Sequence, residues 1–319
     1  MLDLKSLRTR ENHREKEIDF VRCVLMCIVI LVHIVNLEEL YPATKASMFT
    51  FFMPAFLIIT GYLVNIDKSP RQFGVYLMRI ALPYIIMVTI FSLLSCVLPV
   101  RDSLEELSVH ALVKRVFVTS IGPYWFLYDM IICGATYYIV FHFINSRFNL
   151  ASRLSVLAFL LYVEAYFLPL LSFQNASLYL IGVVLRQWGS SFRDIFRPSF
   201  FSLFPFIFLI FQRDLWNKWL CLLLPFFAIS FLIWCYDHIS PPIKNCMNYL
   251  GHNTLPIYIF HPIFTMLSKY YLPLFSFDPT GILHATVTLM LSFAGSIFIA
   301  KILDKTGLSL IFGSKTMLR

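Results

Sequence analysis

Long apolar runs recur along the chain, each near the length at which an α-helix crosses a membrane, about 20 residues. Ten such runs can be drawn, with polar connections between them. The pattern predicts an all-α integral membrane protein, a polytopic bundle of about ten transmembrane helices. The predicted spans are residues 18–36, 46–64, 75–98, 124–144, 154–171, 176–189, 198–212, 219–236, 254–273 and 280–303.

These spans define one integral membrane domain over residues 18–303, between polar tails at 1–17 and 304–319. The first tail is charged, and the apolar run after it is too long for a signal peptide and lacks a small-residue cleavage site. We therefore expect the first span to be retained. The longest connection, 99–123, contains RDSLEELSVHALVKRVF, which is amphipathic enough to form a helix on the outer surface of the membrane.

The composition is that of a membrane protein, with 59% hydrophobic and 14% charged residues and a mean hydropathy of +0.74. The net charge of +8 is explained by topology rather than by nucleic acid. Ten spans with a cytoplasmic N-terminus place 19 of the 26 lysines and arginines inside and leave 7 outside, so both termini are expected in the cytoplasm. The seven cysteines are expected to be small buried hydrophobes, not disulfides or metal ligands.

An arginine and a histidine interrupt the first span, IDFVRCVLMCIVILVHIVN, at Arg22 and His33. Their spacing places them on one helix face, roughly 20° from eclipsed and roughly 16 Å apart along the axis. Ionisable groups are costly in hydrocarbon, so they usually face a polar cavity and mark a site or a pathway. We expect a slot for a long ligand, with its anionic end at Arg22 and its reactive end at His33.

Each of these residues has a functional and a structural interpretation. His33 could be a general base or a transient acyl carrier, since imidazole titrates near neutral pH, or it could bond across helices in a structural role. Arg22 suits a phosphate, with Asp19 orienting its guanidinium, or it could extend to the lipid headgroups or pair with Asp19 alone. Arg79, at the start of the third span in VYLMRIALPY, leaves the same alternatives.

Later segments carry further candidates, although the chain has no glycine-rich phosphate loop and no soluble-hydrolase motif. In GPYWFLYDM, Tyr124 and Trp125 could bind substrate or form an interfacial belt, and Asp129 is a costly carboxylate that could partner an imidazole or arginine. Glu164 in the fifth span is likewise a carboxylate that is unfavourable in hydrocarbon. In MNYLGHNTLPIYIFHPIF, His261 precedes a proline that breaks the backbone ladder, which favours a structural role slightly over catalysis.

These segments, taken in order, resemble the membrane acyltransferase family 3, integral proteins of bacterial type that O-acylate sugars of envelope and secreted polysaccharides. The first span resembles the family's signature of an arginine, ten residues and a histidine, and FFMPAFLIITGYL resembles its second-span pattern. Arg79 resembles the basic residue of the third span, Trp125-Phe126-Leu127 the fourth-span motif, and LGHNTLPIYIFHP the late motif of exopolysaccharide members. Many members have a glutamate after the fourth-span tryptophan, whereas the nearest acid here is Asp129.

The resemblance implies a multi-pass protein of the bacterial cytoplasmic (inner) membrane that uses an acyl-CoA, most simply acetyl-CoA, and has no permanently bound cofactor or metal. It implies His33 as the catalytic histidine and Arg22 and Arg79 as essential basic residues. The expected acceptor is a sugar hydroxyl of a lipid-linked or polymeric glycan, and the expected partners are membrane lipids but no nucleic acid. The candidate site is completed by Arg71 at the CoA phosphates, by Asp19 and Asp129 behind the reactive groups, and by Tyr124, Trp125 and His261 at the glycan.

Two rival functions account for the same intramembrane charges. A transporter of a polysaccharide or small anion explains them equally well, although the sequence shows no internal repeat. The discriminating property is covalent chemistry, because a transporter does not consume acyl-CoA. A sensor or scaffold without catalysis is a further alternative, against which the intact Arg22 and His33 count weakly.

Overall fold

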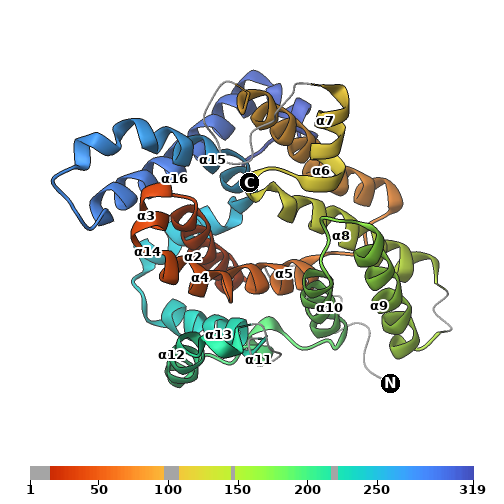
Figure 1. The fold of residues 1–319 in the computed structure, drawn as a ribbon. Coiled ribbons are helices and arrows are strands. Elements are labelled where there is room, and N and C mark those ends of the chain that lie inside the picture. The colour runs from red at the N-terminus through yellow and green to blue at the C-terminus, as the bar shows by residue number, and fades with distance from the viewer. Residues whose placement is uncertain (1–14, 97–107, 145–147, 217–221) are drawn as a thin grey trace.

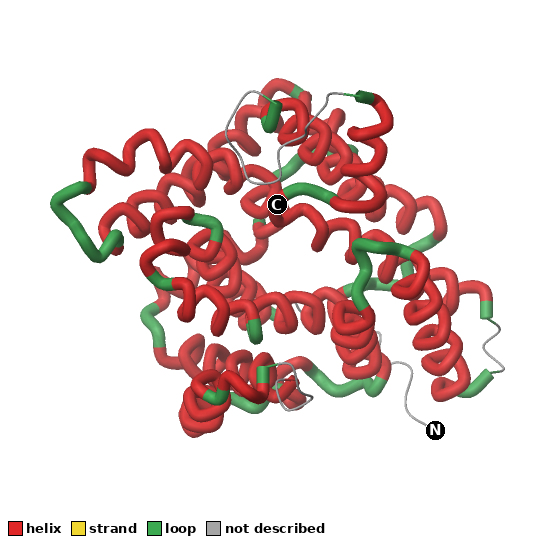
Figure 2. Tube along the Cα trace, in the orientation of Figure 1, coloured by secondary structure: helices red, strands yellow, loops and turns green. Residues whose placement is uncertain are grey.

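The computed structural model of the chain describes residues 15–96, 108–144, 148–216 and 222–319, and the regular structure in these ranges is helical (Figures 1 and 2). The α-helices are α2 (Lys16–Val32), α3 (Val35–Leu40), α4 (Pro42–Phe49), α5 (Phe52–Leu63), α6 (Pro70–Leu94), α7 (Val109–Lys114), α8 (Trp125–Phe143), α9 (Leu150–Phe167), α10 (Phe173–Gln187), α11 (Phe192–Ile195), α12 (Leu203–Phe211), α13 (Leu223–His238), α14 (Pro241–His252), α15 (Thr254–Tyr271) and α16 (Ile282–Thr306).

Every predicted span overlaps one of these helices, so the prediction of an all-helical membrane protein is confirmed. By length and composition, five helical stretches of the described residues can cross a membrane, and two shorter apolar helices accompany them. The count of ten spans and the cytoplasmic termini stay predictions. The five stretches are Pro42–Leu63, Pro70–Leu94, Gly122–Phe143, Leu150–Phe167 and Ile282–Thr306.

Two local features differ from the sequence pattern. The first predicted span is broken, because α2 ends at Val32 and Ile34 adopts an extended conformation (φ −83°, ψ 109°) before α3 begins. A continuous apolar run gives no sign of this break. The second difference is helix α14, which occupies the connection between the predicted spans 219–236 and 254–273. In the long predicted connection, α7 covers Val109–Lys114, whereas 97–107 lies outside the described residues.

Helix α2 lies at the junction of the bundle, where it contacts α5, α13, α14, α15 and α16. Its apolar side chains Val21, Leu25, Met26 and Ile30 are fully buried. Because neighbours surround the middle of α2, its two ends are the places where polar side chains can face open space.

Glycines let certain helices approach to backbone contact. A methyl group at Gly61 on α5 would collide with the carbonyl of Tyr179 on α10, and one at Gly182 on α10 would collide with the carbonyl of Ile58 on α5. Small residues at helix interfaces are a general means of close packing in membranes. Gly251 on α14 similarly lies against the backbone of α2.

We expect Gly251→Ala to destabilise the protein, because its new methyl group collides with the carbonyl of Asp19 and pushes α14 away from α2. Overpacking of this kind costs about 1–3 kcal/mol, and more where backbone has to move. Thermal unfolding of the purified protein measures the effect. Gly74→Ala on α6 is the control, since nothing lies within 4 Å of a methyl group there. Equal unfolding temperatures for the two variants would contradict the prediction.

The predicted C-terminal tail lies against the bundle, near its centre in Figure 1. A short helix, Leu308–Phe312, contacts α6 and α16, and the ring of Phe312 lies 5.8 Å from that of Phe260. Gly313 then turns with φ +72°, where a methyl group would lie 2.9 Å from the carbonyl oxygen of Met78. This turn brings the last residues next to the part of α6 that carries Arg79.

Candidate functional site

Two cavities lie at the two ends of α2. The histidine cavity, about 600 Å³, contains His33 and is lined by residues of α2, α3, α4, α5, α6, α8 and α15. The basic cavity, about 460 Å³, contains Arg22 and is lined by residues of α2, α5, α6, α8, α10, α14, α15 and the last residues of the chain. Tyr258 is the only described residue that lines both. The single slot expected from the sequence is therefore divided at Tyr258.

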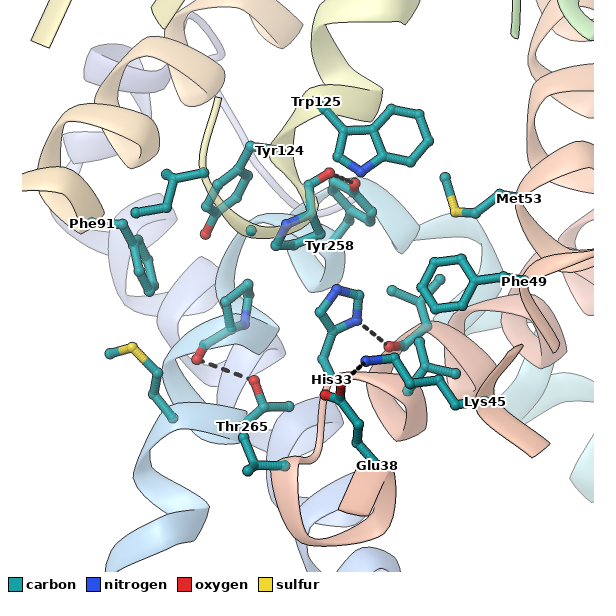
Figure 3. A pocket seen from close by; sticks show the side chains of 18 of the residues that line it. His33, Glu38, Lys45, Phe49, Met53, Phe91, Tyr124, Trp125, Tyr258 and Thr265 are labelled. Atoms are coloured by element: carbon teal, nitrogen blue, oxygen red, sulfur yellow. Dashed lines mark hydrogen bonds and ion pairs between the residues drawn. The ribbon is translucent and has the colours of Figure 1, made fainter. Parts of the chain in front are cut away.

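His33 occupies the position directly after α2, and its ring orientation is fixed by the end of that helix. Its Nδ1 lies 2.6 Å from the carbonyl oxygen of Val29. Because a carbonyl oxygen only accepts hydrogen bonds, Nδ1 carries the proton and donates. The other nitrogen, Nε2, then keeps its lone pair and points toward the open space below Tyr258 in Figure 3. This is the tautomer that a general base requires.

Charged and aromatic side chains surround His33 in the histidine cavity. Glu38 on α3 and Lys45 on α4 form an ion pair of 2.6 Å directly beside the imidazole (Figure 3). Trp125 lies on the far side of the cavity, with Phe91 to one side. Sequence reasoning missed the ion pair, although both charges stand in the short segment between the first two predicted spans.

His261 lies behind the cavity wall and does not line either cavity. Its ring is fully buried and meets that of His33 edge to face, with centroids 5.6 Å apart. Pro262 has no N–H to offer the carbonyl of Tyr258 one turn earlier, and Nδ1 of His261 lies 2.9 Å from that oxygen. His261 thus replaces the hydrogen bond that Pro262 removes and supports the ring of His33.

Two buried tyrosines tie the start of α8 to α15. The hydroxyl of Tyr258 donates to the carbonyl of Pro123, and the hydroxyl of Tyr124 donates to the carbonyl of Ile259 at 2.9 Å. Tyr124 was expected to bind substrate, and it does line the histidine cavity, but its hydroxyl already has this partner. The two bonds fix the partition between the cavities.

The guanidinium of Arg22 is held in place by one polar side chain of its own helix and one of α15. Its Nη1 lies 3.5 Å from Oδ1 of Asp19, and its Nη2 donates to the hydroxyl of Thr254 at the start of α15. Asp19 is only 5% exposed, and His252 lies 3.9 Å from its other oxygen. Asp19 therefore contacts the guanidinium, and its orienting role stays a prediction. Thr254 is a partner of Arg22 that the sequence did not indicate.

Positive charge dominates the basic cavity. Nε of Arg79 is buried and has no hydrogen-bond partner among the residues that the structure describes. The pKa of Lys68 lies below its ordinary value, first because of burial and then because of the charges of Arg319 and Arg79. Five lysine and arginine side chains but only two carboxylate side chains line the cavity among the described residues, so positive side chains outnumber negative ones there. The basic residues are Arg22, Lys68, Arg79, Arg186 and Arg319, and the acids are Glu15 and Asp19.

Three sequence candidates stand away from both cavities. Arg71 lies on an exposed part of the first turn of α6. Asp129 is fully buried in α8, where the structure pairs it with the amide of Asn175 on α10 at 2.8 Å rather than with an imidazole or arginine. Glu164 accepts a hydrogen bond of 2.5 Å from Thr136. Asp129 thus connects α8 with α10, and Glu164 connects α9 with α8.

Comparison with known families identifies the family of the chain. The profile of a family described as an acyltransferase domain matches residues 15–301, a range that includes His33, Arg22 and Arg79 but not the last 18 residues. Searches of curated proteins and of solved structures gave no match. The matched range holds α2 to α15 and most of α16, and therefore both ends of the helix that carries the site. The chain belongs to the acyltransferase 3 family and is a multi-pass membrane acyltransferase.

Proposed function

We propose that the protein transfers an acyl group, most simply acetyl, from acyl-CoA to a sugar hydroxyl of a cell-envelope or secreted polysaccharide in the bacterial cytoplasmic membrane. The observation that carries the proposal is the pair of cavities at the ends of α2. One holds an excess of positive charge, and the other holds a histidine with its Nε2 lone pair directed into the space. The phosphates of a polyanionic donor need the basic cavity, and its neutral thioester needs the cavity that contains the histidine.

The donor occupies the basic cavity with its phosphates. Guanidinium groups bind phosphate through paired hydrogen bonds, and Arg22 and Arg79 come from different helices that converge on this space. With both termini in the cytoplasm, the cavity faces the compartment that contains acyl-CoA. The extended pantetheine arm then runs along α2, over the roughly 16 Å that separate Arg22 from His33, and passes Tyr258.

The reaction needs one proton acceptor. Nε2 of His33 takes the proton of the acceptor hydroxyl while the hydroxyl oxygen attacks the thioester carbonyl. The new C–O bond forms, the C–S bond breaks, and the proton passes from His33 to the departing thiolate, which leaves as the thiol of CoA. In the alternative with an acyl-enzyme, Nε2 itself attacks the thioester and the C–S bond breaks to release the thiolate of CoA. The sugar hydroxyl then attacks the acyl-imidazole, the N–C bond breaks to restore neutral His33, and the hydroxyl proton passes to the thiolate.

The acceptor sugar enters the histidine cavity. Trp125 offers an aromatic face on which a sugar ring can stack, and Glu38 and Lys45 offer hydrogen-bonding groups to its hydroxyls. This end of α2 lies away from the cytoplasm in the proposed topology. A lipid-linked or growing glycan would be accessible there.

Turnover by the purified protein tests the proposal. The protein in nanodiscs is given acetyl-CoA labelled in the acetyl group, with a panel of lipid-linked oligosaccharides, and free thiol and labelled glycan are both measured. We expect thiol release that depends on the glycan, with label in the glycan. Label retained on the protein without glycan would favour the acyl-enzyme route. Absence of thioester cleavage with acetyl-CoA and succinyl-CoA would contradict the proposal and return attention to transport.

A further inference from the structure

The last residues of the chain form part of the wall of the basic cavity. Five side chains from residues 308–319, which we name the C-terminal segment, line this space together with the helices. The family match ends before the segment begins. The segment thus supplies a part of the cavity wall that lies outside the family match. The lining residues are Phe312, Ser314, Thr316, Met317 and Arg319.

A carboxylate on α16 holds the segment in place. Asp304 accepts hydrogen bonds from the backbone N–H groups of Met317 at 2.6 Å and Leu318 at 3.0 Å, and from the hydroxyl of Ser309 at 2.5 Å. Charge-assisted bonds of this kind are the stronger ones in proteins. The two backbone hydrogen bonds fix Met317 and Leu318, the two residues that precede Arg319.

The late motif of the sequence holds Arg319 itself. The side chain of Asn253, between α14 and α15, accepts from the N–H of Arg319 at 2.8 Å and donates to its carbonyl at 3.4 Å. Asn253 directly precedes Thr254, the partner of Arg22. One short turn therefore positions two arginines in the same cavity.

The side chain of Arg319 joins a group of like charges. Its charge and that of Arg79 both act on Lys68, whose ammonium lies 4.5 Å from the centre of the Tyr76 ring. Bringing cations together in a cavity is unfavourable unless an anion binds among them. Asp304, the carboxylate that holds the segment, accepts from the backbone N–H groups of Met317 and Leu318 and does not line the cavity.

We propose that the C-terminal segment completes the donor site, and that Arg319 binds a phosphate at the nucleotide end of the acyl-CoA. Asp304 and Asn253 are positioning residues that hold Arg319 there. This inference rests on the proposed function and extends it to a part of the chain outside the family match. The donor is then recognised by a wall that the bundle alone does not provide.

Binding of CoA without an acceptor tests the inference. Isothermal titration of the protein in nanodiscs compares CoA with pantetheine, which lacks every phosphate, for wild type, Arg319→Gln and Lys315→Gln. Lys315 is an exposed residue of the same segment that lines neither cavity, so its variant is a matched control for the loss of one charge. We expect Arg319→Gln to weaken CoA binding about tenfold, with pantetheine binding unchanged and Lys315→Gln like wild type.

Asp304→Asn tests the positioning role through a separate measurement. We expect the backbone amides of Met317 and Leu318 to exchange hydrogen faster, with CoA affinity falling toward that of Arg319→Gln. Faster exchange with unchanged CoA affinity would overturn the inference, as would an Arg319→Gln variant that binds CoA like wild type. A wild-type protein that binds no CoA would instead overturn the proposed function itself.

Discussion

We expect replacement of His33 by glutamine to lower the rate of acyl transfer by at least about 100-fold, while the affinity for CoA stays the same. The loss of rate is the range expected when a general base is removed. Glutamine keeps a polar side chain of similar reach but has no lone pair of comparable basicity. Binding is preserved because His33 lines the histidine cavity and makes no contribution to the wall of the basic cavity. Thiol release and CoA titration on the same preparation measure the two quantities.

His238→Gln is the matched control for this prediction. His238 ends α13 much as His33 follows α2, and its Nδ1 likewise lies 2.8 Å from the carbonyl four residues earlier, that of Trp234. It lines neither cavity. The control should therefore transfer acyl groups at the wild-type rate. A His33→Gln variant with near wild-type turnover would remove His33 from the chemistry, and one with lost CoA affinity would contradict the division into two cavities.

We expect replacement of Arg79 by glutamine to weaken CoA binding by about 10–100-fold, the equivalent of one lost charge-assisted hydrogen bond. The guanidinium lines the basic cavity, and its buried Nε has no hydrogen-bond partner within the described part of the chain. A phosphate would satisfy it. Pantetheine, without phosphates, should bind the variant and the wild type equally, which separates a lost phosphate contact from a damaged fold.

Arg71→Gln removes the same charge from the same helix, eight residues earlier, and serves as the control. Arg71 is exposed and lies outside the cavity wall, although the sequence offered it as a further phosphate ligand. We expect its variant to bind CoA like wild type. Equal losses for both variants would mean that α6 attracts the donor through its overall charge rather than through Arg79.

The helices and the two ends of the site could be predicted from the sequence because both depend on short-range periodicity. Apolar runs locate the helices, and helical geometry predicts a long separation between Arg22 on α2 and His33, which the structure places directly after the end of α2. The close contact of Arg22 with Asp19 follows from a spacing of three residues. These features need no information about which helix lies beside which.

The remainder of the site depends on contacts between distant parts of the chain. Tyr258 divides the cavities because Pro123 accepts its hydrogen bond, and Arg319 reaches the basic cavity because Asn253 and Asp304 hold its backbone. Sequence spacing carries no sign of such pairs. Hydropathy also marked the end of the chain as a polar tail, since the short helix after α16 is too brief to register.

The partition at Tyr258 has an electrical consequence. In the proposed topology the two cavities open toward opposite faces of the membrane, so the wall between them, which Tyr258 shares, lies within the membrane voltage. Carrying one elementary charge through 100 mV involves about 2.3 kcal/mol. The charged end of the donor therefore stays on one side while the neutral thioester crosses. The wall at Tyr258 would then let the neutral acyl group pass while it blocks the passage of ions.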